Sequence, residues 1–131
     1  MNPDMMTISE MCAAYGVTPR TLRYYESREL LAPERRGLQR LFGKRDRARL
    51  TLILRGKRFG FALEDIRQLL DLYDRDGSSE LQLARTCELA RARLTQMEAQ
   101  RAELDQAIAE LNEQLAWGTD MLAAQRRPAA E

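Results

Sequence analysis

The 131-residue sequence contains no histidine, and its two cysteines, Cys12 and Cys87, lie far apart. Histidine is the commonest metal ligand and the usual acid–base group at neutral pH. Its absence excludes Ser-His and Cys-His catalysis, and two distant cysteines make neither a CxxC motif nor a disulfide framework. We therefore expect no metal site, no cofactor and no enzymatic activity.

Long hydrophobic runs are also missing. No stretch of 18 apolar residues occurs, so the sequence predicts no membrane span. The first residues show no basic segment followed by an apolar one, so we expect no secretory signal and a cytoplasmic location.

The net charge of +1 conceals a strong asymmetry between the two halves of the chain. Residues 1–60 carry 13 Lys and Arg against 6 Asp and Glu, whereas residues 61–131 carry 8 against 14. A basic segment of net charge +7 followed by an acidic one of −6 favours a part that binds polyanions and a separate second part. Ordinary surface charge is the alternative interpretation.

Two short helices joined by a tight turn are predicted near the N-terminus. In "TISEMCAAYGV" (7–17), Thr7 or Ser9 caps the first helix and Gly16 ends it. Thr18 caps the second helix, with Pro19 at its first position. A short turn that contains glycine is typical of a helix-turn-helix.

The second helix, in "TPRTLRYYESREL" (18–30), is rich in arginine and tyrosine. Leu22, Tyr25 and Leu30 are expected to face the core. Arginine forks on another face match phosphates and guanine edges, which predicts a helix that enters a DNA major groove. The alternative is an exposed helix with local pairs such as Arg23 to Glu26. The DNA-binding residues predicted here are Thr18, Arg20, Thr21, Arg23 and Tyr24.

A basic β-ribbon is predicted from Arg35 to Phe42, where turn residues are followed by side chains that alternate. Beside a recognition helix, such a ribbon would form a wing along DNA phosphates. The arginines expected to point outward and bind DNA are Arg35, Arg36 and Arg40.

Two further helices are predicted before a turn at "RDGSS" (75–79). The first begins near Lys44, is weakened by Gly56 and ends at Gly60. Its buried stripe comprises Leu50, Ile53 and Leu54. The next covers 62–74, with Leu63, Ile66, Leu69, Leu70 and Tyr73 at helical spacing.

From Ser79 onward the sequence has a heptad pattern, without glycine or proline between Ser78 and Trp117. More than four heptads predict a coiled coil that needs a partner, and we expect a homodimer. A hairpin within one chain is the alternative, but no break provides its turn. The predicted dimerisation residues are Leu83, Cys87, Ala90, Leu94, Met97, Leu104, Ile108, Leu111 and Leu115, with Arg101 at one further seam position.

These elements predict a mainly α fold: a winged helix-turn-helix DNA-binding head with a helical pair, then one long helix in a dimeric coiled coil. We expect the head at 1–77, the coiled coil at 78–124 and a flexible tail at 125–131. Residues 80–97 have a net charge of +1 and residues 98–120 one of −5. An antiparallel dimer avoids placing the acidic segments together.

The segments "TLRYYESRELLAPERR" (21–36) and "LILRGKRFGFALEDIRQLL" (52–70) resemble the TxRYYExxGLLxPxR and GFxLxEI motifs of the MerR family of bacterial transcription regulators. The resemblance implies a dimer that binds a near-palindromic operator in a long promoter spacer. It also implies a switch that bends and untwists this double-stranded DNA for RNA polymerase. Within the family, "ERRG", "LILRGKRFGF" and "LYD" look most like regulators of branched-chain amino-acid and acyl-CoA catabolism.

Two positions depart from the family pattern. Glu29 stands where the family usually has glycine, and glutamate in a left-handed cap costs roughly 1 kcal/mol. We therefore expect that corner to be built differently. The family wing often reads GYRxY, whereas this chain has "LQRLF" (38–42), with Gly37 one position early.

The sequence points only weakly to an effector. Family metal sensors place cysteines at the start of the dimer helix and in a loop after it, whereas Cys87 lies within the heptads, so we expect a small non-metal ligand. Trp117, Met121 and Leu122 form a small apolar end, which either packs against the partner's head or forms a ligand pocket. The residues predicted for that pocket are Tyr73, Trp117 and Met121. The competing function is a coiled-coil adaptor or structural protein whose basic head binds nucleic acid non-specifically.

Overall fold

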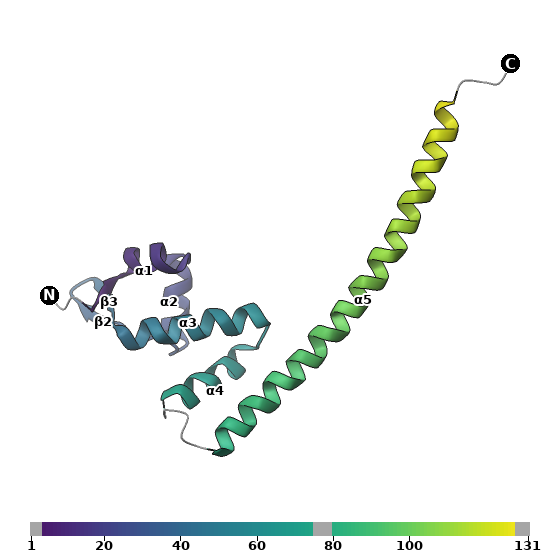
Figure 1. The fold of residues 1–131 in the computed structure, drawn as a ribbon. Helices are drawn as coiled ribbons and strands as arrows, with labels where there is room; N and C mark the ends of the chain where they lie inside the picture. Colours follow the sequence, from purple (N-terminus) through teal and green to yellow (C-terminus); the bar gives the residue numbers. More distant parts are fainter. Residues whose placement is uncertain (1–3, 75–79, 128–131) are drawn as a thin grey trace. The chain divides into compact units, whose positions relative to one another are not determined.

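The computed structural model describes residues 4–74 and 80–127, apart from the side chain of Tyr73. The predicted "RDGSS" turn lies outside the described residues. Within them the elements are β1 (Met6–Thr7), α1 (Ile8–Tyr15), α2 (Pro19–Ser27), β2 (Glu34–Arg36), β3 (Gln39–Phe42), α3 (Lys44–Phe59), α4 (Leu63–Asp74) and α5 (Glu80–Arg126) (Figure 1). The mainly α fold with a small antiparallel sheet and a long last helix is confirmed.

The chain divides into two compact units, Met1–Leu89, here called the head, and Ala90–Glu131. The division falls later than the predicted boundary at residue 77, and a hydrogen bond joins the start of α5 to α4. There the Arg85 Nε donates a hydrogen bond to the Gln68 Oε1 at 3.3 Å. No helix among the described residues has both the length and the apolar character needed to cross a membrane.

The caps of α1 and α2 follow the sequence prediction. Thr7 caps α1: its hydroxyl accepts from the Glu10 amide, and the Glu10 carboxylate accepts from the Thr7 amide. Gly16 ends α1 with a φ of 65°, in the left-handed region. Thr18 caps α2 by accepting from the Thr21 amide at 3.1 Å. These caps define the tight turn of the helix-turn-helix.

The corner at Glu29 is not built differently, and our expectation there is wrong. Glu29 has a φ of 61° and occupies the left-handed position that glycine would favour. Its amide donates to the Glu26 carbonyl, and the Leu30 amide donates to the Tyr25 carbonyl, each at 2.9 Å. This is the Schellman arrangement, and the buried side chains of Tyr25 and Leu30 provide its apolar contact. Burial of Leu30 imposes the corner despite the strain at Glu29.

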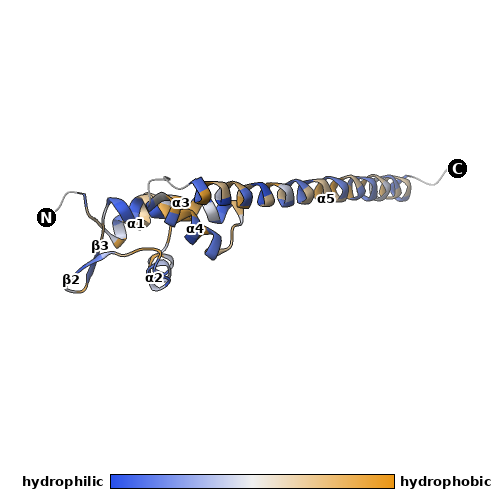
Figure 2. Ribbon diagram, turned by 90° about the horizontal axis from the view of Figure 1, so that it is seen from below, coloured by the Kyte–Doolittle hydropathy of each residue, from blue (hydrophilic) through white to orange (hydrophobic). Residues whose placement is uncertain are grey.

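The wing is formed by β2 and β3, whose strand pairing places Arg36 opposite Gln39 across a two-residue turn. Gly37 has a φ of 62° at the first turn position, which matches a type II′ turn. The sequence did not predict β1, which pairs antiparallel with β3 and gives the sheet the order β1-β3-β2. Figure 2 shows much of β2 in hydrophilic blue.

The core of the head joins α1, α2, α3, α4 and β3. Leu22, Tyr25 and Leu30 are buried as predicted, and so are Leu50 and Ile53 of α3. The other buried apolar residues of this cluster are Met11, Leu31, Phe42, Ile66 and Leu70.

Gly56 has a packing role that the sequence prediction missed. A Cβ at Gly56 would lie 2.8 Å from the Ile66 Cγ1, which is closer than real side chains approach. The glycine that weakens α3 therefore lets α4 pack directly against its backbone. The α3–α4 pair, called the helical pair below, depends on this contact.

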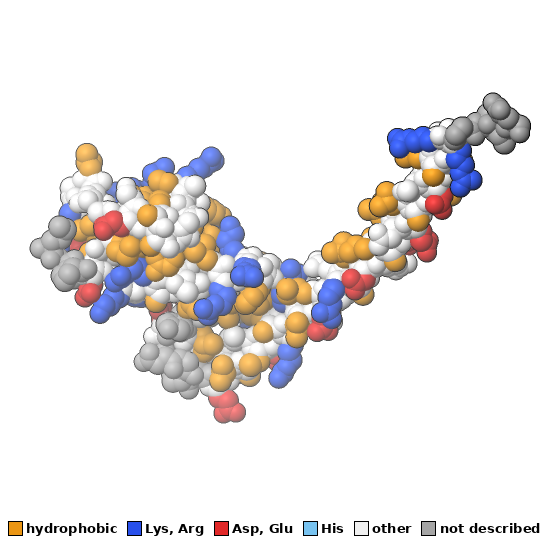
Figure 3. Space-filling view, turned by 45° about the horizontal axis from the view of Figure 1, so that its top comes forward, with side chains coloured by type: hydrophobic (Ala, Val, Ile, Leu, Met, Phe, Trp, Pro, Cys, Tyr) orange, Lys and Arg blue, Asp and Glu red, His pale blue; other side chains and the backbone are white. Residues whose placement is uncertain are grey.

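The long helix α5 has no buried residue among those described. Hydrophobic side chains, drawn in orange in Figure 3, lie exposed along α5. The apolar seam residues that are exposed include Leu83, Leu94, Met97, Leu104, Ile108, Leu111 and Leu115. Cys87 and Ala90 of the predicted seam are also exposed. Such a stripe gains little from folding as one chain alone, which is the property that predicted a partner helix.

Candidate nucleic-acid interface

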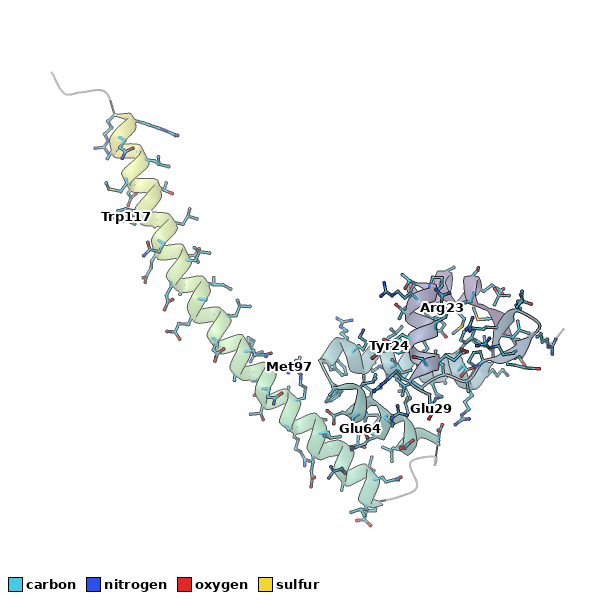
Figure 4. All side chains as sticks on the ribbon, turned by 180° about the vertical axis from the view of Figure 1, so that it is seen from behind. Arg23, Tyr24, Glu29, Glu64, Met97 and Trp117 are labelled. Atoms are coloured by element: carbon cyan, nitrogen blue, oxygen red, sulfur yellow. The ribbon has the colours of Figure 1, made fainter. Side chains whose placement is uncertain are left out.

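The exposed face of α2 carries the cations predicted to bind DNA. Arg20 and Arg23 are exposed, and the Tyr24 side chain is 49 % exposed. Figure 4 labels Arg23 and Tyr24 on α2. The contacts described for this part of the chain pair neither arginine with a carboxylate. Their guanidinium groups are therefore available to phosphates and base edges.

Thr18 and Thr21 serve first as a helix cap. Their hydroxyl oxygens lie 2.9 Å apart, and the Thr18 hydroxyl also accepts from the Thr21 amide. Thr18 is exposed and Thr21 half-buried. Both lie at the N-terminal end of α2, where the helix dipole favours an anion.

The wing arginines are not all directed outward. Arg36 is exposed and pairs loosely with Glu34 at 3.6 Å. In contrast, Arg35 and Arg40 both contact the Glu26 carboxylate on α2, at 3.2 and 3.0 Å. The Arg40 side chain is only 23 % exposed, so our expectation that it points freely outward is wrong.

Glu26 pairs with the wing rather than within its own helix. The sequence alternative, a local Arg23–Glu26 pair, is replaced by contacts 9 and 14 residues away along the chain. Sequence spacing gives no sign of these contacts, because they depend on how the wing folds back onto α2. The match of Glu26 to the TxRYYE motif was the only available signal.

Lys57 is a cation near α2 that the sequence prediction did not include. Its Nζ lies 5.9 Å from the centre of the Tyr25 ring. Lys57, Arg20 and Tyr24 line a hollow of about 510 Å³ between α2 and the helical pair. A further hollow of about 460 Å³ lies beside the wing and is lined by Arg23, Arg40, Ser9, Thr7, Ile8, Leu38 and Gln39.

Two other arginines of the head bind backbone carbonyls at and just after the C-terminal end of α2. The Arg49 Nε donates to the Leu30 carbonyl at 2.7 Å, and the Arg67 Nη2 donates to the Arg28 carbonyl at 2.6 Å. Arg49 also pairs with Asp74 at 2.7 Å. The Arg28 carbonyl is one that the C-terminal end of α2 leaves without a helical partner, whereas the Leu30 carbonyl lies in the segment that follows the helix.

Asp74, the last residue of α4, ties the helical pair together. Arg45 and Arg49 of α3 both reach its Oδ2, at 2.9 and 2.7 Å. The hydrogen bond from Arg45, helped by the charge of Arg49, holds the pKa of Asp74 below its ordinary value. The same contact raises the pKa of Arg45. These arginines therefore have structural contacts already, unlike Arg20 and Arg23.

The residues predicted for an effector pocket lie in different units. Trp117, labelled in Figure 4, and Met121 are exposed on α5, and their spacing of four residues places them about one helical turn apart. Tyr73 belongs to α4, and its side chain lies outside the described residues. Among the described residues, no three His, Cys, Asp or Glu side chains are grouped so that they could hold a metal ion.

The sequence matches two family descriptions that together span the head and much of α5. "MerR HTH family regulatory protein" matches residues 6–73, and "MerR, DNA binding" matches residues 47–114. The chain belongs to the MerR family. The MerR-family resemblance is thereby confirmed, and the protein is a DNA-binding transcription regulator.

Two curated MerR-family relatives illustrate the extent of similarity. The HTH-type transcriptional regulator HmrR of Rhizobium leguminosarum bv. viciae is 36 % identical over 110 residues, which cover 82 % of this chain and 77 % of HmrR. The mercuric resistance operon regulatory protein of Pseudomonas fluorescens is 35 % identical over 75 residues, or 56 % of this chain and 52 % of that protein. The match therefore spans only about half of the latter relative. Both relatives are named as regulators, not as enzymes.

A solved MerR-family structure shows the same fold along nearly the whole chain. HiNmlR, described as a MerR-family regulator lacking the sensor domain and bound to promoter DNA, has a TM-score of 0.71 with this chain. The comparison covers 95 % of this chain and 97 % of that one, at 23 % identity. At this identity the similarity supports the fold and not the individual contacts.

Proposed function

We propose that this MerR-family chain acts as a homodimer that binds a near-palindromic operator within a promoter spacer. Its α2 helices would read two major-groove half-sites while the wings lie along the flanking phosphates. The observation that carries the proposal is the exposed face of α2, where Arg20, Arg23 and Tyr24 have no carboxylate partner among the described residues. The residues assigned to DNA contact are Thr18, Arg20, Thr21, Arg23, Tyr24, Arg35, Arg36 and Arg40.

The test is a binding titration of the Arg20→Ala, Arg23→Ala double variant on the operator found by footprinting upstream of its own and neighbouring genes. Loss of a base-reading arginine costs about 1–3 kcal/mol and relaxes specificity at one position. The matched control is Arg91→Ala, Arg126→Ala, which removes two exposed cations from α5. Unchanged operator affinity of the α2 variant would disprove the assignment. Binding that ignores sequence would favour the non-specific adaptor instead.

Dimerisation would pair the two α5 helices antiparallel. The segment 80–97 has a net charge of +1 and 98–120 has −5, so opposite directions place unlike segments together. A crossing between Arg101 and Leu104 places Leu94 against Leu111, Met97 against Ile108 and Ala90 against Leu115. Trp117 then lies near the start of the partner's α5.

A cysteine cross-link distinguishes the two directions of the coiled coil. In the antiparallel register Cys87 lies opposite Gly118, about 31 residues from its twin, or roughly 45 Å at the helical rise. In a parallel coil the two Cys87 side chains face each other. Mild oxidation of a dilute Cys12→Ser variant should therefore give little disulfide dimer on a non-reducing gel. Rapid and complete cross-linking would show that the helices run parallel.

The bound dimer would bend and untwist the spacer so that RNA polymerase meets both promoter elements, which places its activity in the cytoplasm with the transcription machinery. A gel-shift series with the operator at the middle or the end of the fragment would reveal the bend, because a bend at the middle slows migration most. Equal mobility at all positions would contradict this part of the proposal.

The effector we propose is a small non-metal ligand that binds at the exposed apolar end of α5, beside Trp117 and Met121. The supporting observation is the donor chemistry: the sequence has no histidine, and Cys12 and Cys87 are far apart in it. The name of the mercuric resistance relative concerns that protein, of which the match covers about half. Tight stoichiometric binding of zinc, copper(I) or mercury by the reduced protein, with a matching change in transcription, would overturn the proposal.

A further inference from the structure

The wing contains a pair of like charges that face each other across its two strands, β2 and β3. Arg35 of β2 stands directly opposite Arg40 of β3. Residues that face each other across an antiparallel pair lie on the same side of the sheet, and like charges there destabilise the pairing. The wing therefore needs a countercharge on that side.

Glu26 of α2 supplies the countercharge with both of its oxygens. The Arg40 Nε lies 3.1 and 3.0 Å from Oε1 and Oε2, and the Arg35 Nη2 lies 3.3 and 3.2 Å from the same atoms. The Glu26 side chain is 19 % exposed, compared with 55 % for Glu34, which pairs with Arg36. Glu26 is thus a shielded clamp between the recognition helix and the wing, whereas Glu34 forms an open surface pair.

The clamp also fixes where the wing presents its charge. Arg40 and Arg23 line the same hollow, so the contact with Glu26 sets Arg40 beside a cation of α2. The group of Glu26, Arg35 and Arg40 carries a net charge of +1 rather than +2. Fewer mobile cations are left to bind phosphates at arbitrary positions.

We infer that Glu26 is a positioning residue that increases discrimination between operator and other DNA. Phosphate contacts are independent of sequence, so unrestrained wing arginines strengthen binding to every duplex. Arginines clamped to α2 reach their phosphates only when α2 lies correctly in its groove. This inference rests on the proposed DNA-binding function and adds to it a residue outside the set assigned to DNA contact.

The test compares Glu26→Gln with Glu34→Gln in the full-length protein, titrated with the operator duplex and with a scrambled duplex of equal length and composition. Both variants remove one negative charge from the wing region. For Glu26→Gln we expect tighter binding to scrambled DNA and an operator preference reduced by about tenfold or more. The salt slope on scrambled DNA should steepen by about 0.9 for each new phosphate contact. Glu34→Gln should change all three quantities little.

Arg40→Lys provides a variant that keeps the wing charge. The variant loses the guanidinium contact with Glu26, so we again expect a reduced operator preference. Unlike Glu26→Gln, it does not change the net charge of the wing region. Thermal unfolding of each variant checks that the head stays folded. Equal slopes for Glu26→Gln and Glu34→Gln would overturn the inference, as would an operator preference that Arg40→Lys leaves unchanged. If the unmodified protein itself showed no operator preference, the proposed function would fail instead.

Discussion

In the head, ten apolar side chains are buried against one another, whereas the long α5 helix buries none among its described residues. The head also holds its helix ends with side chains from neighbouring elements, as Arg49 and Arg67 do at the exit from α2. In α5, the hydroxyl groups of Thr86, Thr95 and Thr119 each donate to a backbone carbonyl four residues earlier in the same helix. The difference indicates that the head is stabilised within one chain, and it supports the proposal that α5 pairs with a second copy.

The largest effect should come from charges in the seam of α5. Leu104→Glu with Ile108→Glu places four carboxylates in the dimer seam, and we expect dimerisation to weaken at least about a thousandfold, or ~4 kcal/mol. Sedimentation equilibrium measures the loss, and the thermal unfolding of the head should persist.

The control is Ala102→Glu with Gln106→Glu, which adds the same charge on the outer side of the predicted heptads. An intact dimer in the seam variant, or equal loss in both, would show that the seam is misplaced.

A substitution of glycine should have opposite effects in the two regions. Gly56→Val would drive a side chain into Ile66 and destabilise the head by about 2–3 kcal/mol. Gly118→Ala meets nothing within 4 Å in the chain and should stabilise α5 by up to about 1 kcal/mol through helix propensity. Chemical denaturation followed by circular dichroism gives both values. Stabilisation of the head by Gly56→Val would contradict the close α3–α4 contact.

Relief of the strained corner should stabilise the head. Glu29 has a φ of 61°, so Glu29→Gly removes a left-handed Cβ and should raise the free energy of unfolding by roughly 1 kcal/mol. Glu29→Ala keeps the Cβ and removes only the carboxylate, so it should show no comparable gain. Equal gains from both substitutions would assign the effect to charge rather than to backbone conformation.

The smallest expected effect is a pH dependence at the end of α4. The pKa of Asp74 is lowered in the folded state by Arg45 and Arg49, so its stabilising contribution is fully present above the ordinary carboxyl pKa of 3.8. The contribution is lost as the pH falls through the lowered value. Asp74→Asn should therefore cost about 1 kcal/mol or less at pH 7 and progressively less below pH 4.

Asp71→Asn, an exposed carboxylate in the same helix, serves as the control. The free energy of unfolding of each variant is measured across this pH range. A cost at Asp74 that is constant with pH would exclude the ion pair as its cause.

Local sequence signals predicted most of the head because caps, glycines and helical spacing act within a few residues. Thr7, Gly16, Thr18 and Pro19 each appear at the predicted cap or first-turn position. The corner at Glu29 was mispredicted because only the local free-energy cost of a left-handed glutamate was considered. The burial of Leu30, which follows it and offsets this cost, depends on the folded core.

Contacts between elements could not be predicted from spacing. Glu26 meets Arg35 and Arg40 only after the wing has folded, and its helical neighbour Arg23 was the simpler partner to expect. β1 was not predicted because a segment of two residues is too short to show an alternating pattern. Gly56 was identified as a weak point in a helix, although its packing against Ile66 requires α4 to be in place.

The absence of buried residues along α5 has a consequence for amide hydrogen exchange. A single helix without tertiary packing opens readily in water, so its amides exchange quickly even when most of its residues are helical at any moment. In a dimer, pairing of the two helices would protect the same amides, and they would exchange mainly through the dissociated chain. Their exchange rates would rise on dilution while those of the head core stay constant. The exchange rates along α5 would thus depend on protein concentration, whereas those in the head would depend on its folding stability alone.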